Sequence, residues 1–315
     1  MKKEEFYFDS RDNSTKIHAV RWIPDSENVA GVVQIVHGMA EYVERYEEFA
    51  TFLTEKNYVV TGEDHLGHGK SVPEGGQQGY FCEQDPATVV VRDVHRLKKM
   101  TQELYPGVPY FLMGHSMGSF IVRNYICRYG TGIDGALILG TGMQSDGLLL
   151  ASKTVAALEG AFRGQKHVSK FLDKGAFGNY NKHIKDVRTS ADWLTRDASK
   201  VDEYIADKDC GFVFTVNGFK TLFTLISRAK KKENLKNVPA SLPIFMASGE
   251  EDPVGGYGKG VKRAWQSLKE AGVTDLTLKL YPEDRHELLN ELDRKQIMED
   301  IAGWLAKYLV IPDSI

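Results

Sequence analysis

The sequence lacks the features of several protein classes. Its three cysteines, Cys82, Cys127 and Cys210, are odd in number and widely spaced, which argues against a disulfide-stapled secreted domain. No apolar segment reaches the roughly 18 residues of a membrane-spanning helix, and the N-terminus has no signal-peptide stretch. We therefore expect a cytoplasmic protein without a membrane span.

The sequence also lacks a large excess of charge of either sign. The 315 residues carry a formal net charge of −3 and have a pI of about 6.3, and we find no repeat or low-complexity segment. Because no strong positive field would attract a nucleic-acid backbone, we expect no nucleic-acid partner. The length and the hydrophobic content of 42% are sufficient for one large core plus an insertion.

Strand-like and helix-like segments alternate in the first part of the chain. The run GVVQIVHG at 31–38 is typical of a buried strand, and the apolar residues of 46–53 recur at helical spacing. We expect further strands over 4–10, 16–24, 58–65, 109–116 and 135–142, and helices over 85–105 and 117–129. This alternation predicts an α/β fold, with a mostly parallel eight-stranded sheet and helices on both faces.

The alternation stops between residues 143 and 237, where we expect a mostly helical insertion, which is called the cap below. It resumes with a strand from 243, a helix over 261–271, a strand in DLTLKLYPEDRH and a last helix over 294–308. The chain is thus divided into a first core part, 1–142, the cap, 143–237, and a second core part, 238–315.

The sequence GHSMG at 114–118 stands where a strand meets a helix. In a G-x-S-x-G turn the serine lies on a sharp, strained bend, and glycine lets the neighbouring backbone pass close by. Ser116 is therefore the candidate nucleophile. The bare motif also arises by chance, so a base and an acid are needed to support it.

Asp252 and His286 follow the two later strands of the sheet. The carboxyl ends of parallel strands share one edge, and the order Ser116, Asp252, His286 is that of an α/β-hydrolase triad. His286 would take the serine proton and Asp252 would hold the imidazole. The backbone N–H groups of Met39 and Met117 are the candidate oxyanion-hole donors.

Several neighbouring residues compete for these roles. Asp252 is favoured over the other nearby carboxylates because Pro253 steadies its loop and the strand before it carries it to the sheet edge. Glu283 and Asp284 are expected to be surface charges. His115 is expected to point away from the site, and His37 to make a structural hydrogen bond. The remaining acids near the site in sequence are Glu250 and Glu251.

No cofactor is expected. Asp64, His65 and His68 could suggest a metal site, but they lie in a glycine-flanked loop without a thiolate or an H-E-x-x-H frame. The aromatic run in the cap has two interpretations, which the sequence leaves open. Its residues could line an acyl pocket or form the cap's own core: Phe212, Phe214, Phe219, Leu222 and Phe223.

Together these segments resemble the monoacylglycerol lipase and lysophospholipase branch of the α/β-hydrolase superfamily, the serine-aminopeptidase-like group. The resemblance rests on HGMAEYVERYEEFATFL, DHLGHGKS, GHSMGS, WLTRD, CGFVFTVNGF, GEEDPVGGYGKGV and RHELLNE, which span nearly the whole chain. It implies the triad Ser116, Asp252 and His286, the oxyanion donors Met39 and Met117, and a cap over 143–237.

The function implied is a serine hydrolase that cleaves carboxylic esters through an acyl-enzyme. The expected substrates are monoacylglycerols, lysophospholipids or small acyl esters, and the oligomeric state stays open. One alternative is an aminopeptidase of the same group, which would use a cap carboxylate such as Asp202, Glu203 or Asp207 to bind the substrate ammonium. The other is a catalytically idle binding protein on this fold.

Overall fold

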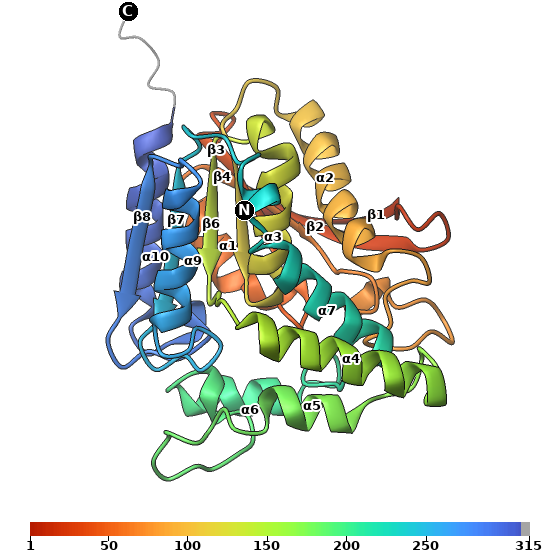
Figure 1. Cartoon of the computed structure of the whole chain (residues 1–315). Helices are drawn as coiled ribbons and strands as arrows, with labels where there is room; N and C mark the ends of the chain where they lie inside the picture. The colour runs from red at the N-terminus through yellow and green to blue at the C-terminus, as the bar shows by residue number, and fades with distance from the viewer. Residues whose placement is uncertain (310–315) are drawn as a thin grey trace, which may run out of the picture.

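The structure, a computed structural model, describes residues 1–309, and an eight-stranded sheet forms its centre (Figure 1). The strands lie in the order β1-β2-β4-β3-β5-β6-β7-β8. β2 pairs antiparallel with β1 and β4, and all other pairs are parallel. The predicted, mostly parallel eight-stranded sheet is confirmed. Its strands are β1 (Lys2–Asp9), β2 (Lys16–Ile23), β3 (Gly31–Val36), β4 (Tyr58–Glu63), β5 (Tyr110–His115), β6 (Gly135–Leu139), β7 (Ile244–Gly249) and β8 (Leu276–Tyr281).

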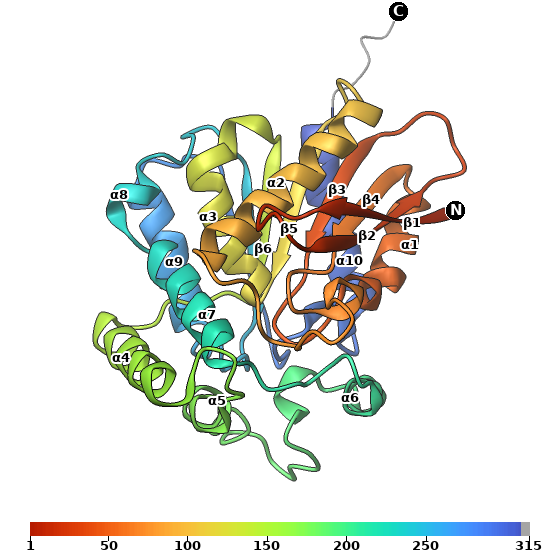
Figure 2. The same cartoon turned by 90° about the vertical axis from the view of Figure 1, so that its right-hand side faces the viewer.

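Helices cover both faces of the sheet (Figure 2). Alternate side chains of a strand point to opposite faces, and both faces of β5 are apolar. Tyr110 and Leu112 pack in the cluster with α2 (Pro86–Leu104), α3 (Met117–Tyr129) and α9 (Lys259–Glu270). Phe111 and Met113 pack in the opposite cluster, with α1 (Glu47–Thr54) and α10 (Arg294–Leu305). The strands are therefore buried from both sides.

The connection between β6 and β7 is helical, as expected. It contains α4 (Asp146–Arg163), α5 (Lys170–Phe177), α6 (Ala198–Ala206), α7 (Val216–Arg228) and α8 (Lys232–Leu235). Figure 1 shows α4, α5 and α6 beyond the carboxyl ends of the parallel strands. α7 packs against both α4 and the core helix α3, so it joins the cap to the core. The cap boundaries at residues 143 and 237 stay a prediction.

Within residues 1–309, no helix combines the length and the apolar character that crossing a bilayer requires. The three cysteines are free thiols.

Candidate active site

Ser116 lies on a strained turn between β5 and α3, with φ 52° and ψ −118°. A residue with a side chain rarely adopts a positive φ, and such strain persists where the surrounding structure enforces it. The two flanking glycines explain how the turn fits. A Cβ atom on Gly118 would overlap the carbonyl oxygen of Val36, and one on Gly114 would overlap the carbonyl oxygen of Gly118.

Asp252 and His286 form a buried pair behind this turn. His286 Nδ1 lies 3.0 Å from Asp252 Oδ2, and both side chains are almost inaccessible to solvent. The same carboxylate accepts hydrogen bonds from the Ser248 hydroxyl at 3.0 Å and from the Val254 N–H at 2.8 Å. Burial alone would raise the pKa of Asp252, but His286 and these hydrogen bonds hold it below its ordinary value.

Ser116 and His286 line one cavity of about 480 Å³ beneath the cap helices, and Met39 and Met117 line it too. Neither the Met39 nor the Met117 N–H group donates a hydrogen bond to any atom of residues 1–309. Unpaired N–H groups at a cavity wall are free to bind a ligand oxygen. The structure thus brings the sequence-predicted residues together at one cavity, with Asp252 behind His286.

A buried ion network supports the loop that carries Met39. The Gly38 N–H donates to Glu41 Oε1 at 2.5 Å. Arg45 joins Glu41, at 2.6 Å, to Glu287, at 2.9 Å. Glu287 follows His286 directly in the chain, so this network ties the Met39 loop to the histidine loop. The motif HGMAEYVER predicted the loop but not this network.

His115 does not point away from the site, and that prediction was wrong. Its ring lies 4.7 Å from the His286 ring, and its Nδ1 lies 3.3 Å from Glu41 Oε1. Burial disfavours its charged form, but the bond to Glu41 raises the pKa of His115 above its ordinary value. His115 is the last residue of β5, and it lines the active-site cavity.

Asp284 is also not a surface charge, unlike Glu283, whose side chain is 84% exposed. Asp284 is buried and paired with Arg196 of the cap, which also bonds Glu291 and Asp293. Burial and the neighbouring Glu291 raise the pKa of Asp284 to about 7. No local sequence pattern predicts this cluster, because its arginine lies 88 residues from Asp284 in the chain.

The aromatic residues predicted for an acyl pocket divide between wall and core. Phe212 lines the cavity, together with Leu222 of α7. The other three phenylalanines are buried in the hydrophobic core instead: Phe214, Phe219 and Phe223. Four further aromatic residues of the cap line the cavity and were not foreseen: Phe177, Tyr180, Trp193 and Tyr204.

The histidines of the DHLGHG loop make structural contacts. The His65 N–H donates to His37 Nε2 at 3.0 Å, and His68 Nδ1 lies 2.9 Å from the Leu66 carbonyl oxygen. Burial lowers the pKa of His37 to about 4 and that of His68 to about 3. Asp64 accepts a hydrogen bond from the Val43 N–H at 2.9 Å, which ties this loop to the segment that follows Met39.

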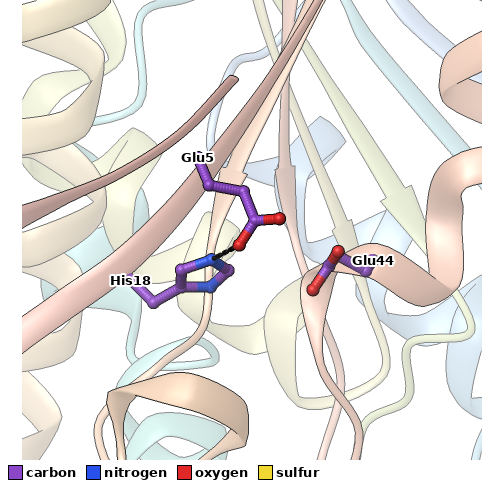
Figure 3. A group of neighbouring side chains, drawn as sticks. All are labelled: Glu5, His18 and Glu44. Carbon is purple, nitrogen blue, oxygen red and sulfur yellow. Dashed lines mark hydrogen bonds and ion pairs between the residues drawn. The ribbon is translucent and has the colours of Figure 1, made fainter. Parts of the chain in front are cut away.

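Two clusters in residues 1–309 have a spacing that suits a metal ion, but the carboxylates of each are already paired with a lysine or arginine side chain. In the first, His18 Nε2 lies 3.1 Å from Glu5 (Figure 3), and Lys70 Nζ bonds Glu5 at 2.7 Å and Glu44 at 3.0 Å. The second is the carboxylate cluster around Arg196. We assign no metal to either cluster.

Residues 27–293 match the model of the family described as serine aminopeptidase, S33. The chain belongs to this family. The match confirms the resemblance inferred from the motifs. The S33 chain is 27% identical over 291 residues to a monoacylglycerol lipase of Mycolicibacterium smegmatis, covering 91% of this chain and 92% of the relative. It is 26% identical to a monoglyceride lipase of Rattus norvegicus, covering 92% and 86%.

Among solved structures, the S33 chain is similar to a highly thermostable carboxyl esterase from Bacillus coagulans, determined in complex with glycerol. The two chains are 29% identical and superpose with a TM-score of 0.91, over 98% of this chain and 100% of that one. The soluble variant of a Saccharomyces cerevisiae monoglyceride lipase, at 21% identity and a TM-score of 0.78, has the same fold.

Proposed function

We propose that this protein is a serine hydrolase that cleaves carboxylic esters through an acyl-enzyme. The observation that carries the proposal is the buried pair of His286 and Asp252 at a cavity that also exposes Ser116 on its strained turn. The monoglyceride lipases and the carboxyl esterase named above support the same reaction class.

In this mechanism His286 takes the proton of the Ser116 hydroxyl as that oxygen attacks the ester carbonyl. The proton then passes from His286 to the oxygen of the leaving alcohol. Water then attacks the acyl-enzyme carbonyl while His286 takes its proton. His286 returns that proton to the Ser116 oxygen as the acid is released. Asp252 keeps the His286 proton on Nδ1 and stabilises the imidazolium.

The Met39 and Met117 N–H groups would bind the oxyanion that forms in each step. Each such donor contributes about 2.7–4 kcal/mol to transition-state stabilisation. The bond from the Gly38 N–H to Glu41 holds the Met39 loop before substrate arrives, so little reorganisation is needed.

The cavity wall favours esters without a phosphate group. No lysine or arginine side chain of residues 1–309 lines it, so a lysophospholipid phosphate would find no cation there. Phe212, Leu222 and Ile226 give the wall an apolar side suited to an acyl chain. Monoacylglycerols and small acyl esters therefore fit this site better than lysophospholipids.

Neither alternative function is favoured. The relatives named above are lipases and an esterase, which favours ester hydrolysis. The three cap carboxylates considered for an aminopeptidase lie outside the cavity wall: Asp202, Glu203 and Asp207. Within residues 1–309, Asp173 is the one cap carboxylate on that wall. Asp202 pairs with Arg188 instead, and Asp207 accepts a hydrogen bond from the Tyr42 hydroxyl. An idle binding protein would have no use for an intact pair of His286 and Asp252.

Rapid mixing with p-nitrophenyl butyrate tests the proposal. We expect a burst of one p-nitrophenolate per chain, followed by slower turnover, because acylation releases the phenolate before the acyl-enzyme is hydrolysed. Ser116→Ala should give neither phase. Faster cleavage of an aminoacyl arylamide than of any ester would favour the aminopeptidase, and no turnover of either substrate would favour the binding protein.

A further inference from the structure

Asp173 of α5 lines the active-site cavity, and within residues 1–309 its carboxylate has neither a hydrogen bond nor an ion pair. The other two wall carboxylates, Glu41 and Glu287, are both bonded to Arg45. Burial raises the pKa of Asp173, as expected for a carboxylate without a nearby cation. The cavity wall therefore contains one uncompensated negative charge.

Three aromatic side chains form a chain of contacts that begins next to Asp173 on the same helix. Phe177 is one helical turn after Asp173 on α5, so the two side chains share a face of the helix. The Tyr180 ring lies 5.3 Å from the Phe177 ring and 4.8 Å from the Trp193 ring. All three rings line the cavity. Aromatic faces attract cations, so this wall and Asp173 favour the same kind of ligand.

The position of Trp193 indicates which half of the ester this wall faces. Its ring lies 5.0 Å from the His286 ring. Because His286 delivers its proton to the leaving oxygen, the alcohol half must lie next to the imidazole during the reaction. The groups around Trp193 therefore face the alcohol half, whereas Met39 and Met117 face the carbonyl oxygen.

The cavity wall offers no protein cation to Asp173. No lysine or arginine side chain of residues 1–309 lines the cavity. A positively charged group of a ligand would therefore be the counter-ion of the Asp173 carboxylate.

We propose that Asp173, Phe177, Tyr180 and Trp193 form a subsite for an ammonium group on the alcohol half of the ester. The inference rests on the proposed ester hydrolysis and names its preferred substrate class: acyl esters of amino alcohols or of quaternary ammonium alcohols. A neutral alcohol half still binds but leaves the Asp173 charge unpaired. Asp173 is thus a specificity-determining residue that contacts the substrate and takes no part in the proton transfers.

A pair of isosteric esters tests the subsite. Butyrylcholine and 3,3-dimethylbutyl butyrate have the same acyl group and nearly the same shape, and they differ in the charge of the alcohol half. We expect kcat/KM of the wild-type protein to be roughly tenfold higher for butyrylcholine, the size of effect that a cation over aromatic faces beside a carboxylate gives.

Asp173→Asn should bring the ratio of the two kcat/KM values to about one, by lowering the value for butyrylcholine alone. Asp202→Asn is the matched control: it removes a cap carboxylate that lies outside the cavity wall and should leave the ratio unchanged.

Equal kcat/KM values for the two esters in the wild-type protein would overturn the subsite. So would an unchanged ratio in Asp173→Asn, or an equal loss for both esters, since either result would mean that Asp173 does not sense charge. In these cases turnover of p-nitrophenyl butyrate still supports ester hydrolysis. If that ester too is not cleaved, the proposed function itself fails.

Discussion

The Asp252 carboxylate lies 3.0 Å from His286 Nδ1 and also accepts hydrogen bonds from Ser248 and Val254. Three donors therefore converge on one buried carboxylate, and they keep it ionised although it is shielded from water. A charge held in this way fixes the histidine tautomer that the proposed mechanism needs, with the proton on Nδ1 and the acceptor Nε2 free for the serine.

Asp252→Asn tests that relationship. The amide cannot stabilise the imidazolium and favours the wrong tautomer, so kcat for p-nitrophenyl butyrate should fall roughly 10⁴-fold. Asp284→Asn is the matched control near the same histidine, and it should change kcat by less than about tenfold. If Asp284→Asn abolished activity and Asp252→Asn did not, the acid would be misassigned.

The cluster around Arg196 makes stability depend on pH. The folded-state pKa of Asp284, about 7, lies above the ordinary value of 3.8, so the folded protein holds this proton more tightly than the unfolded chain. The contribution of Asp284 to stability is then fully present below about pH 3.8 and is lost as pH rises toward 7.

Asp284→Asn should therefore gain stability relative to the wild-type protein between pH 5 and pH 7.5, by about 1 kcal/mol after allowance for solvent screening. Urea unfolding of both proteins at the two pH values measures this difference. A difference that does not change with pH would show that Asp284 is ionised in the folded protein throughout this range.

Glu41 should act by positioning the oxyanion loop. Glu41→Gln removes the negative charge that accepts the Gly38 N–H and pairs with His115 and Arg45. We expect kcat to fall roughly tenfold to a hundredfold with KM little changed, because a misplaced oxyanion loop stabilises the transition state less but hardly affects binding of the ester.

Glu44→Gln, three residues further along, is the control. Glu44 pairs with Lys3 and Lys70 near the N-terminal strands and should be replaceable without loss of kcat. A rise in KM for Glu41→Gln with kcat unchanged would rule out the positioning role.

The apolar wall of the cavity predicts a dependence on acyl length. Each CH₂ group buried against Phe212, Leu222 or Ile226 contributes about 0.8 kcal/mol, so kcat/KM should rise about fourfold per added carbon over short chains. A series of p-nitrophenyl esters from acetate to octanoate measures the rise. A flat series would show that the acyl chain stays outside this wall.

The sequence was sufficient for the architecture because its signals there are local. Apolar runs of strand length alternating with amphipathic helices predict a parallel sheet, and such a sheet brings loops after different strands to one edge. Ser116, Asp252 and His286 could therefore be grouped from motif, order and position, although Asp252 lies 34 residues from His286.

The cavity wall could not be predicted in the same way. Helical spacing indicates which side chains share a face, but it does not say what that face packs against. The sequence therefore left open whether Phe219 and Phe223 line a pocket or form core, and they lie in the core. Phe177 and Trp193 belong to short segments whose placement depends on tertiary contacts. Asp284 and His115 were misjudged for the same reason, because their burial depends on the distant Arg196 and Glu41.

The most direct test of the account is covalent labelling with a fluorophosphonate, followed by mass spectrometry of the intact protein and of its peptides. The account predicts one adduct per chain, located on Ser116. Ser116→Ala should fold normally, by circular dichroism and thermal unfolding, yet take up no label and lose turnover by several orders of magnitude. A label on another residue, or persistent labelling and turnover in Ser116→Ala, would contradict the account.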